Sequence, residues 1–224
     1  MSERVAAIVP MRHSSSRVVG KNYRPLAGKP LYRHIVESLL AASLVTEVVI
    51  DTDSELLWRD AQSEFPSVRL LERPAPLADE MASMNDVLLN TVTQVDADVY
   101  LQTHSTNPLV RPGSIDAAIA AFLEGRPQHD SLFTVTPVYK RFWTADGRAV
   151  NHDPEMLLRT QDLPPIMEEN SCLYLFERST LELRRNRIGA RPLIFPLDPE
   201  EALDIDEELD LVLVEGIIAR GRVG

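Results

Sequence analysis

The stretch "VAAIVP" at residues 5–10 is apolar along its whole length and shows no alternation of apolar and polar residues. This pattern is typical of a strand buried on both faces, as in the parallel sheets of α/β proteins. A polar loop follows directly and contains the cations Arg12, Arg17, Lys21 and Arg24. Because ligands bind beyond the carboxyl ends of parallel strands, we expect this basic loop to lie at a binding edge.

Similar apolar segments recur along the chain and alternate with segments of helical periodicity. We expect strands at residues 47–53, 67–74, 97–108, 131–138 and 192–198, and a strand leading into a helix at 171–181. We expect helices at residues 31–43, 55–65, 84–95, 113–125 and 204–220. This alternation predicts βαβ units and therefore an α/β fold with a mostly parallel sheet.

Composition restricts the classes of function. The 224 residues carry a net charge of −11, which argues against a broad nucleic-acid-binding surface. No apolar run approaches the length of a membrane span, and the N-terminal sequence does not resemble a secretory signal, so we expect a cytoplasmic protein. Cys172 is the single cysteine, which excludes an internal disulfide and a cysteine-based zinc site. It lies in an apolar segment, and we expect it to be buried rather than nucleophilic.

Residues 138–170 interrupt the regular pattern. They contain a turn signal at Asp146-Gly147 and a proline pair at Pro164-Pro165, without a long period of either kind. We interpret this segment as an inserted arm with short strands, within a single domain that spans residues 1–224.

An acidic pair precedes the last predicted helix. Asp204 and Asp206 flank Ile205, and residues two apart in an extended segment point the same way. Two carboxylates on one side form a hard oxygen site that suits Mg²⁺ together with substrate phosphates. The alternative is a helix N-cap, in which Glu207 and Glu208 favour the helix dipole. The segment alone leaves both interpretations open.

The basic loop and the acidic pair together indicate metal-assisted phosphoryl chemistry. Arg12 can grip two phosphate oxygens at once, whereas Lys21 provides a mobile point charge. The loop lacks the glycine patterns of a Walker motif and of a dinucleotide fingerprint. The alternative is a solvated charged loop without a ligand.

The segments "IVPMRHSSSRVVGKNYRPLAGKPL", "VVIDTDSE", "ERPAPLADEMASMNDVLLNTV", "THSTNPLVRPGSI", "ENSCLYLF" and "DIDEELDL" occur in one order along most of the chain. In this order they resemble the acylneuraminate cytidylyltransferase family, which makes CMP-sialic acids and related CMP-nonulosonates. The resemblance implies a Rossmann-like, three-layer α/β/α nucleotidyltransferase fold similar to glycosyltransferase A. It also implies a reaction in which CTP and a 2-keto sugar acid give a CMP-sugar and pyrophosphate. A homodimer is implied as well, with the 138–170 arm reaching toward the partner subunit.

The resemblance assigns roles to individual positions. It implies triphosphate contacts and catalytic roles for Arg12 and Lys21, and a catalytic role for Asp206. Other nucleotide contacts are implied for Ser15, Asn22 and Arg73. Sugar contacts are implied for His104, Thr106 and Asn170, and Mg²⁺ ligation for Asp204 and Asp206.

Two departures from the family pattern keep other functions open. Ser16 replaces a lysine, and the resulting pattern R-x-x-S-x-R-x-x-G-K from Arg12 to Lys21 is similar to Kdo cytidylyltransferases. His104 replaces the glutamine implicated in sugar binding. The alternatives are a Kdo or amino-Kdo cytidylyltransferase, and a nucleotide-binding regulatory protein without turnover.

Overall fold

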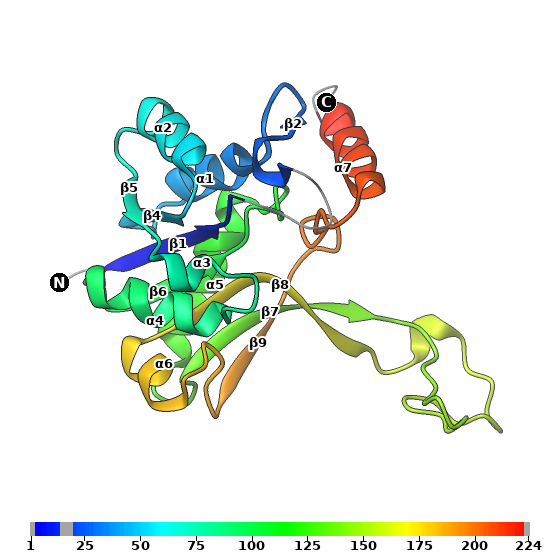
Figure 1. Cartoon of the computed structure of the whole chain (residues 1–224). Helices are drawn as coiled ribbons and strands as arrows, with labels where there is room; N and C mark the ends of the chain where they lie inside the picture. The colour runs from blue at the N-terminus through cyan, green and yellow to red at the C-terminus, as the bar shows by residue number, and fades with distance from the viewer. Residues whose placement is uncertain (1–2, 14–19, 222–224) are drawn as a thin grey trace.

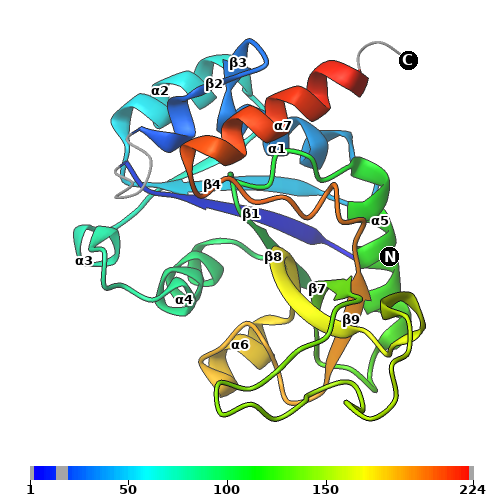
Figure 2. The same cartoon turned by 90° about the vertical axis from the view of Figure 1, so that its right-hand side faces the viewer.

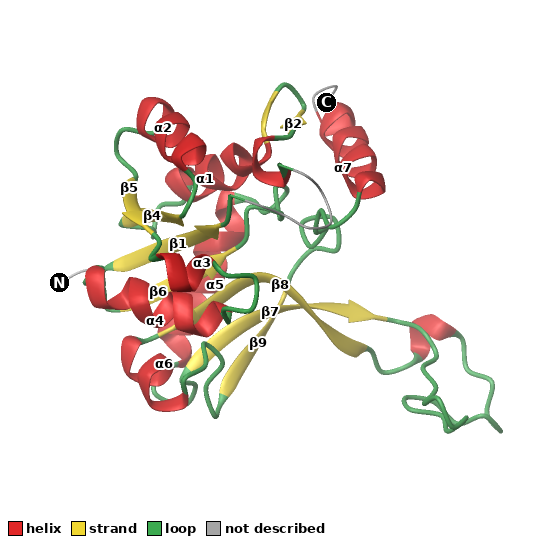
Figure 3. Ribbon diagram, viewed as in Figure 1, coloured by secondary structure: helices red, strands yellow, loops and turns green. Residues whose placement is uncertain are grey.

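A mixed sheet forms the centre of the molecule. The computed structural model describes residues 3–13 and 20–221. Within these residues the main sheet has seven strands in the order β5-β4-β1-β6-β8-β7-β9. The strands are β1 (Val5–Met11), β4 (Glu47–Thr52), β5 (Arg69–Glu72), β6 (Val99–Thr103), β7 (Ser131–Val138), β8 (Ile166–Phe176) and β9 (Pro192–Pro196). Only β8 runs antiparallel to its neighbours, so the predicted mostly parallel sheet is confirmed (Figure 3).

Helices cover both faces of this sheet (Figures 1 and 2). One face packs against α1 (Leu31–Ala41), α2 (Glu55–Glu64) and α5 (Pro112–Gly125), and the other against α4 (Met84–Gln94) and α6 (Arg178–Arg184). Along β1, Ala7 and Val9 contact the first group, whereas Ala6 and Ile8 contact the second. This alternation explains why the segment is apolar at every position. The predicted three-layer α/β/α architecture is confirmed.

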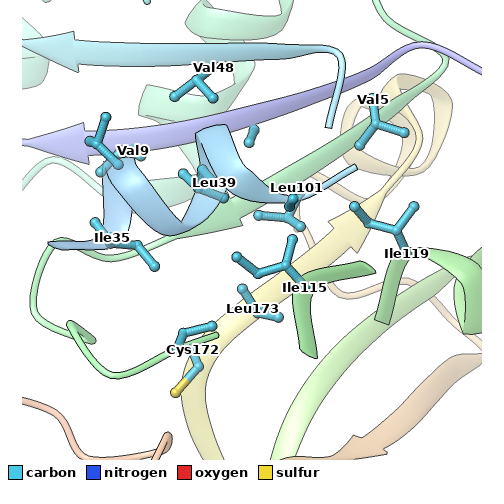
Figure 4. Close-up of a cluster of buried hydrophobic side chains, with 14 of the residues drawn as sticks. Val5, Val9, Ile35, Leu39, Val48, Leu101, Ile115, Ile119, Cys172 and Leu173 are labelled. Carbon is cyan, nitrogen blue, oxygen red and sulfur yellow. The ribbon is translucent and has the colours of Figure 1, made fainter. Parts of the chain in front are cut away.

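The larger core cluster lies on the α1, α2 and α5 side of the sheet (Figure 4). It includes Cys172, which is fully buried within β8 beside Leu173. Burial raises the pKa of the Cys172 thiol to about 12, so the thiolate is absent at neutral pH. The predicted structural role of this cysteine is confirmed.

A third, smaller cluster joins the C-terminal helix to the N-terminal part of the chain. Helix α7 (Glu208–Gly221) packs through Leu211 and Val214 against Leu26 of a small hairpin, which the sequence did not predict. The hairpin consists of β2 (Pro25–Leu26) and β3 (Lys29–Pro30). Figure 2 shows α7 lying beside this hairpin. The contact brings residues from the two ends of the chain to one place.

The helix predicted at residues 204–220 begins only at Glu208. Residues 204–206 stay extended, because the amide of Ile205 donates to the carbonyl of Thr106 at 2.9 Å. Three further short helices, absent from the prediction, are η1 (Lys21–Tyr23), α3 (Ala75–Ala78) and η2 (Thr160–Asp162). In the described residues, no helix combines the length and the apolar character needed to cross a membrane.

The segment between β7 and β8 projects from the body of the molecule (Figure 1). The two strands pair beyond the main sheet as far as Val138 and Ile166, and residues 139–165 continue the projection with a single isolated bridge between Trp143 and Ala149. The arm is therefore shorter than the predicted 138–170, since residues 166–170 belong to β8.

Candidate active site

A cavity of about 500 Å³ opens at the carboxyl ends of the parallel strands. Arg12 follows β1, Arg73 follows β5 and His104 follows β6, so the sheet itself brings these side chains to one edge. The predicted residues that line the cavity are Arg12, Lys21, Arg73, His104, Thr106, Asp204 and Asp206. Both predicted clusters, basic and acidic, therefore meet in one place.

Lys21 connects the two clusters directly. Gly20 has a φ of 64°, a left-handed conformation that favours glycine, and the turn η1 starts immediately after it. This turn buries the lysine stem and directs its Nζ at the acidic segment. Nζ donates to the carbonyl of Ile205 at 2.6 Å and to Oδ1 of Asp206 at 3.1 Å. Lys21 thus contacts two residues that lie 184 and 185 positions further along the chain.

Ile205 holds the acidic pair in place. Its side chain is fully buried in the cluster with Leu211 and Val214, while Asp204 and Asp206 on either side line the cavity. The extended geometry expected from the sequence is therefore present. The helix cap comes from another residue, since Oδ2 of Asp210 accepts from the amides of Asp206 and Glu207 at 2.9 and 2.7 Å.

The acidic pair fits a hard divalent cation only in part. No group of three His, Cys, Asp or Glu side chains in the described ranges is placed to hold a metal ion. Two carboxylates, Asp204 and Asp206, face the cavity. Mg²⁺ is commonly held by one or two carboxylates together with waters and substrate phosphates. The donor set therefore suits Mg²⁺ that arrives with a polyphosphate.

Arg73 is at the floor of the cavity and is itself buried. Its Nε donates to Oδ1 of Asp51 at 2.6 Å, and its NH2 donates to the carbonyl of the same residue at 3.0 Å. Thr91 donates to the other carboxylate oxygen at 2.7 Å. Both side chains of the ion pair are 1% exposed. This arginine is therefore held by the protein before any ligand enters.

Two predicted residues lie outside the cavity lining. Asn22 accepts from Ser105 Oγ at 2.6 Å and donates to the Arg12 carbonyl at 3.0 Å, so it ties two loops together. Asn170 accepts from Thr134 Oγ1 at 2.6 Å and donates to Thr136 Oγ1 at 3.1 Å across to β7. Ser15 lies outside the described residues, as do Ser16 and Arg17.

Comparison with known proteins agrees with this geometry. The sequence model of the family described as "Cytidylyltransferase" matches residues 6–216, which is nearly the whole chain. The chain belongs to the cytidylyltransferase family. It is therefore a nucleotidyltransferase that uses CTP.

Relatives of this cytidylyltransferase act on different acceptors. It is 27% identical to CMP-N,N'-diacetyllegionaminic acid synthase of Legionella pneumophila, over 96% of each chain. It is 30% identical to 2-C-methyl-D-erythritol 4-phosphate cytidylyltransferase of Frankia casuarinae, over 98% of this chain and 83% of the relative. A match to 3-deoxy-manno-octulosonate cytidylyltransferase of Geotalea daltonii has 31% identity but spans only 54% of this chain and 46% of the relative.

A solved structure shows the same fold. The structure of CMP:2-keto-3-deoxy-manno-octonic acid synthetase complexed with CTP superposes with a TM-score of 0.71, at 18% identity. The match covers 97% of this cytidylyltransferase and 99% of that chain. The predicted Rossmann-like α/β fold is thus confirmed by an independent comparison.

Arg187 and Ser171 are among the residues of the cytidylyltransferase cavity that sequence reasoning missed. Arg187 follows α6 and lines the cavity, where its guanidinium carbon lies 3.5 Å from the ring centroid of Tyr174. Ser171 also lines it, in a left-handed conformation with a φ of 59° at an irregularity in the pairing of β7 and β8. Arg187 stands in the arginine-rich run "RRNRIGAR", and nothing in that run singles it out.

The environment of His104 keeps its imidazole neutral. NH1 of Arg187 donates to Oε1 of Gln102, so the amide nitrogen of Gln102 faces Nε2 of His104 at 3.1 Å. Nε2 must then accept, which leaves the proton on Nδ1. Burial lowers the pKa of His104 to about 4, helped by the positive charges of Arg187 and Lys21 and opposed by Asp206. At neutral pH His104 offers one hydrogen-bond donor and no charge.

Proposed function

We propose that this cytidylyltransferase transfers CMP from CTP to the anomeric hydroxyl of a 2-keto sugar acid of the nonulosonic type, with release of pyrophosphate. The observation that carries the proposal is the meeting of Arg12, Lys21, Asp204 and Asp206 in one cavity. The whole-length similarity to a CMP-N,N'-diacetyllegionaminic acid synthase supports the choice of acceptor.

The cavity has two sides in this proposal. The phosphate side comprises Arg12, Lys21 and Arg73, and the acceptor side comprises His104, Ser171 and Arg187. On the phosphate side, Arg12 and Lys21 stabilise the charge that builds up on the β- and γ-phosphates as pyrophosphate leaves. The ammonium group of Lys21 has three donors, so in this proposal it can keep its bond to the Ile205 carbonyl while it exchanges its contact with Asp206 for a phosphate oxygen.

The acidic pair is proposed to hold the metal. Asp204 and Asp206 would bind Mg²⁺, which neutralises phosphate charge and lowers the pKa of a hydroxyl bound to it. The chain itself contributes the position of these carboxylates. Ile205, which packs against α7, and Asp210, which accepts from the amide of Asp206, hold this segment at the phosphate side of the cavity. These contacts hold the backbone between the two carboxylates in place before substrate binds.

A Kdo-type acceptor is the second candidate. The pattern R-x-x-S-x-R-x-x-G-K in the basic loop favours it, as does the partial match to a 3-deoxy-manno-octulosonate cytidylyltransferase. Both candidates share the 2-keto acid and its anomeric hydroxyl. They differ in the length and substituents of the sugar, which the acceptor side would contact.

The proposal is tested by a pyrophosphate-release screen. Purified protein with CTP is offered N-acetylneuraminate, a diacetylated nonulosonic acid, Kdo and 2-C-methyl-D-erythritol 4-phosphate, each with Mg²⁺ and with EDTA. We expect Mg²⁺-dependent release with a nonulosonic acid. Release with Kdo alone would select the second candidate. Release with the erythritol phosphate alone, or CTP binding without release for any acceptor, would reject the keto-acid proposal.

We also propose that the arm mediates a homodimer. Apolar side chains on it are exposed in the single chain, among them Trp143, Met156 and Leu157, the last at 87%. Burying such side chains against a second copy would remove apolar surface from water. Light scattering of the intact chain is expected to give twice the mass of one chain, and Leu157→Asp to shift the equilibrium toward the monomer.

A further inference from the structure

We propose that Arg187 binds the carboxylate of the acceptor, and that the arginine, held by Tyr174 and Gln102, selects acidic acceptors over neutral ones. This inference rests on the proposed function, because it concerns the acceptor side of the same cavity. It assigns a ligand chemistry to a residue that neither the sequence pattern nor the family resemblance singled out.

The charge of Arg187 is not balanced by an ion pair. Across residues 3–13 and 20–221, no carboxylate lies within salt-bridge distance of its guanidinium, although Arg185 in the same loop pairs with Asp86 at 2.8 Å. Glu169 acts on Arg187 electrostatically, but its carboxylate accepts from the hydroxyl of Tyr174. Burial opposes the charge and lowers the pKa of Arg187, so an anion entering the cavity would relieve that cost.

The guanidinium is oriented before ligand arrives. It lies 3.5 Å from the ring centroid of Tyr174, within the range of a cation–π contact. NH1 donates to Gln102, and the backbone amide of Arg187 donates to Asn85 Oδ1 at 3.1 Å. A guanidinium has five N–H donors in a planar fork, so donors remain for a carboxylate. A pre-oriented fork gives up less side-chain entropy on binding than a mobile one.

The position of Arg187 matches the chemistry of a 2-keto sugar acid. In such a sugar the carboxylate and the reacting hydroxyl are attached to the same carbon, so their binding groups must be neighbours. Arg187 lines the same cavity as His104, Lys21 and Asp206, and all three charged groups act on His104 electrostatically, so the arginine lies near the groups of the phosphate side. A hydroxyl directed at the phosphate side therefore places its carboxylate toward Arg187.

The test measures the contribution of the ligand's charge. N-acetylneuraminate and its methyl ester are titrated by calorimetry into the protein with α,β-methylene-CTP and Mg²⁺, so that no turnover occurs; Kdo and its methyl ester form a second pair. For wild type we expect the acid to bind at least about tenfold more tightly than the ester, the size of a charge-assisted hydrogen bond. In Arg187→Gln the two ligands should bind with equal affinity.

Other outcomes overturn the inference. Retention of the acid preference in Arg187→Gln would show that another cation binds the carboxylate. The absence of any preference in wild type, or binding of 2-C-methyl-D-erythritol 4-phosphate but of neither acid, would show that the carboxylate is not the ligand. Failure of the proposed function would appear separately, as a lack of pyrophosphate release. The ratio of the affinities for acid and ester does not depend on that result, because it is measured without turnover.

Three variants complete the design. Arg185→Gln lies two residues away, has an exposed side chain that pairs with Asp86, and should keep the wild-type ratio. Arg187→Lys keeps the charge without the planar fork and should keep part of the preference. Gln102→Met removes the acceptor that orients the guanidinium, so it should weaken the preference for the acid over the ester but not eliminate it. The Gln102 variant also serves if Arg187→Gln fails to fold, as judged by its thermal midpoint.

Discussion

On the phosphate side of the cavity Lys21 and Arg73 are paired with carboxylates of the chain, whereas on the acceptor side Arg187 faces an aromatic ring and an amide. Lys21 contacts Asp206 at 3.1 Å and Arg73 contacts Asp51 at 2.6 Å. Arg187 lies over Tyr174 and donates to Gln102. Both sides therefore carry cations, but Lys21 and Arg73 have carboxylate partners, whereas the partners of Arg187 are neutral.

This difference has a physical meaning. A triphosphate carries several negative charges and brings a metal ion, so the phosphate side can remain nearly neutral until the ligand and the cation arrive together. An acceptor with one carboxylate brings a single negative charge. A cation without an ion-pair partner can bind that carboxylate without first breaking another ion pair. The predictions below test this contrast in order of decreasing effect.

The largest effect is expected at the carboxylate that Lys21 contacts. Asp206→Ala should lower the rate of pyrophosphate release by about 10³-fold or more, because it removes a proposed metal ligand and the partner of the lysine. Steady-state assays with CTP and an accepted sugar provide the measurement. Glu207→Gln, on an exposed neighbour, is the control. Near-normal turnover of the alanine variant would remove the metal role of Asp206.

A buried ion pair on the phosphate side should dominate stability. Asp51→Ala leaves the guanidinium of Arg73 buried without its partner, so we expect the free energy of unfolding to fall by about 3–5 kcal/mol. Urea titration measures this loss. Asp96→Ala, at an exposed ion pair with Arg4, should leave the urea midpoint almost unchanged. Equal losses at the two sites would contradict the buried pairing.

His104 should make stability depend on pH on the acidic side. Its pKa in the folded chain is about 4, below the ordinary 6.5, so below pH 6.5 the unfolded chain takes up a proton that the folded chain refuses. This part of the stability is complete above pH 6.5 and is lost as the pH falls toward 4. We expect His104→Gln to lose roughly 2 kcal/mol less than wild type between pH 7 and pH 4. Parallel pH dependence of the two proteins would contradict a neutral, desolvated imidazole.

The smallest effect is expected for Arg187 on stability. Since no ion pair is lost, Arg187→Gln should lower the free energy of unfolding by only about 1 kcal/mol, the size of its contacts with Tyr174 and Gln102. Urea titration beside Asp51→Ala gives the direct comparison between the two sides. A loss as large as that of Asp51→Ala would show that Arg187 is a structural cation and would weaken the contrast.

The fold could be predicted from the sequence because its signals are local. The uniformly apolar run at residues 5–10 indicated a strand covered on both faces, and helices do cover both faces of β1. The meeting of Lys21 with Asp206 followed from the edge rule for parallel sheets and from the family resemblance. The hairpin at residues 25–30 escaped prediction, since two-residue strands carry no periodic signal.

The acceptor side could not be predicted in the same way. Ser171 reaches the cavity through a left-handed residue and an irregular register between β7 and β8, which depend on pairing across the sheet. Arg187 is distinguished from neighbouring arginines only by its contacts with Gln102 and Tyr174. For Asn22 and Asn170 the resemblance supplied the residue type but not the direction of the side chain. Both amides are engaged in holding the protein's own loops and strands.

Ile205 links the chemistry of the enzyme to the last helix of its chain. Its packing partners Leu211 and Val214 belong to α7, which packs against Leu26 of the β2–β3 hairpin. Proteolytic trimming or gentle heating that detaches α7 would therefore displace the carboxylates on either side of Ile205 while the sheet stays intact. We expect activity to be lost before circular dichroism reports unfolding of the sheet, and the docking of α7 would then limit the temperature at which the enzyme works.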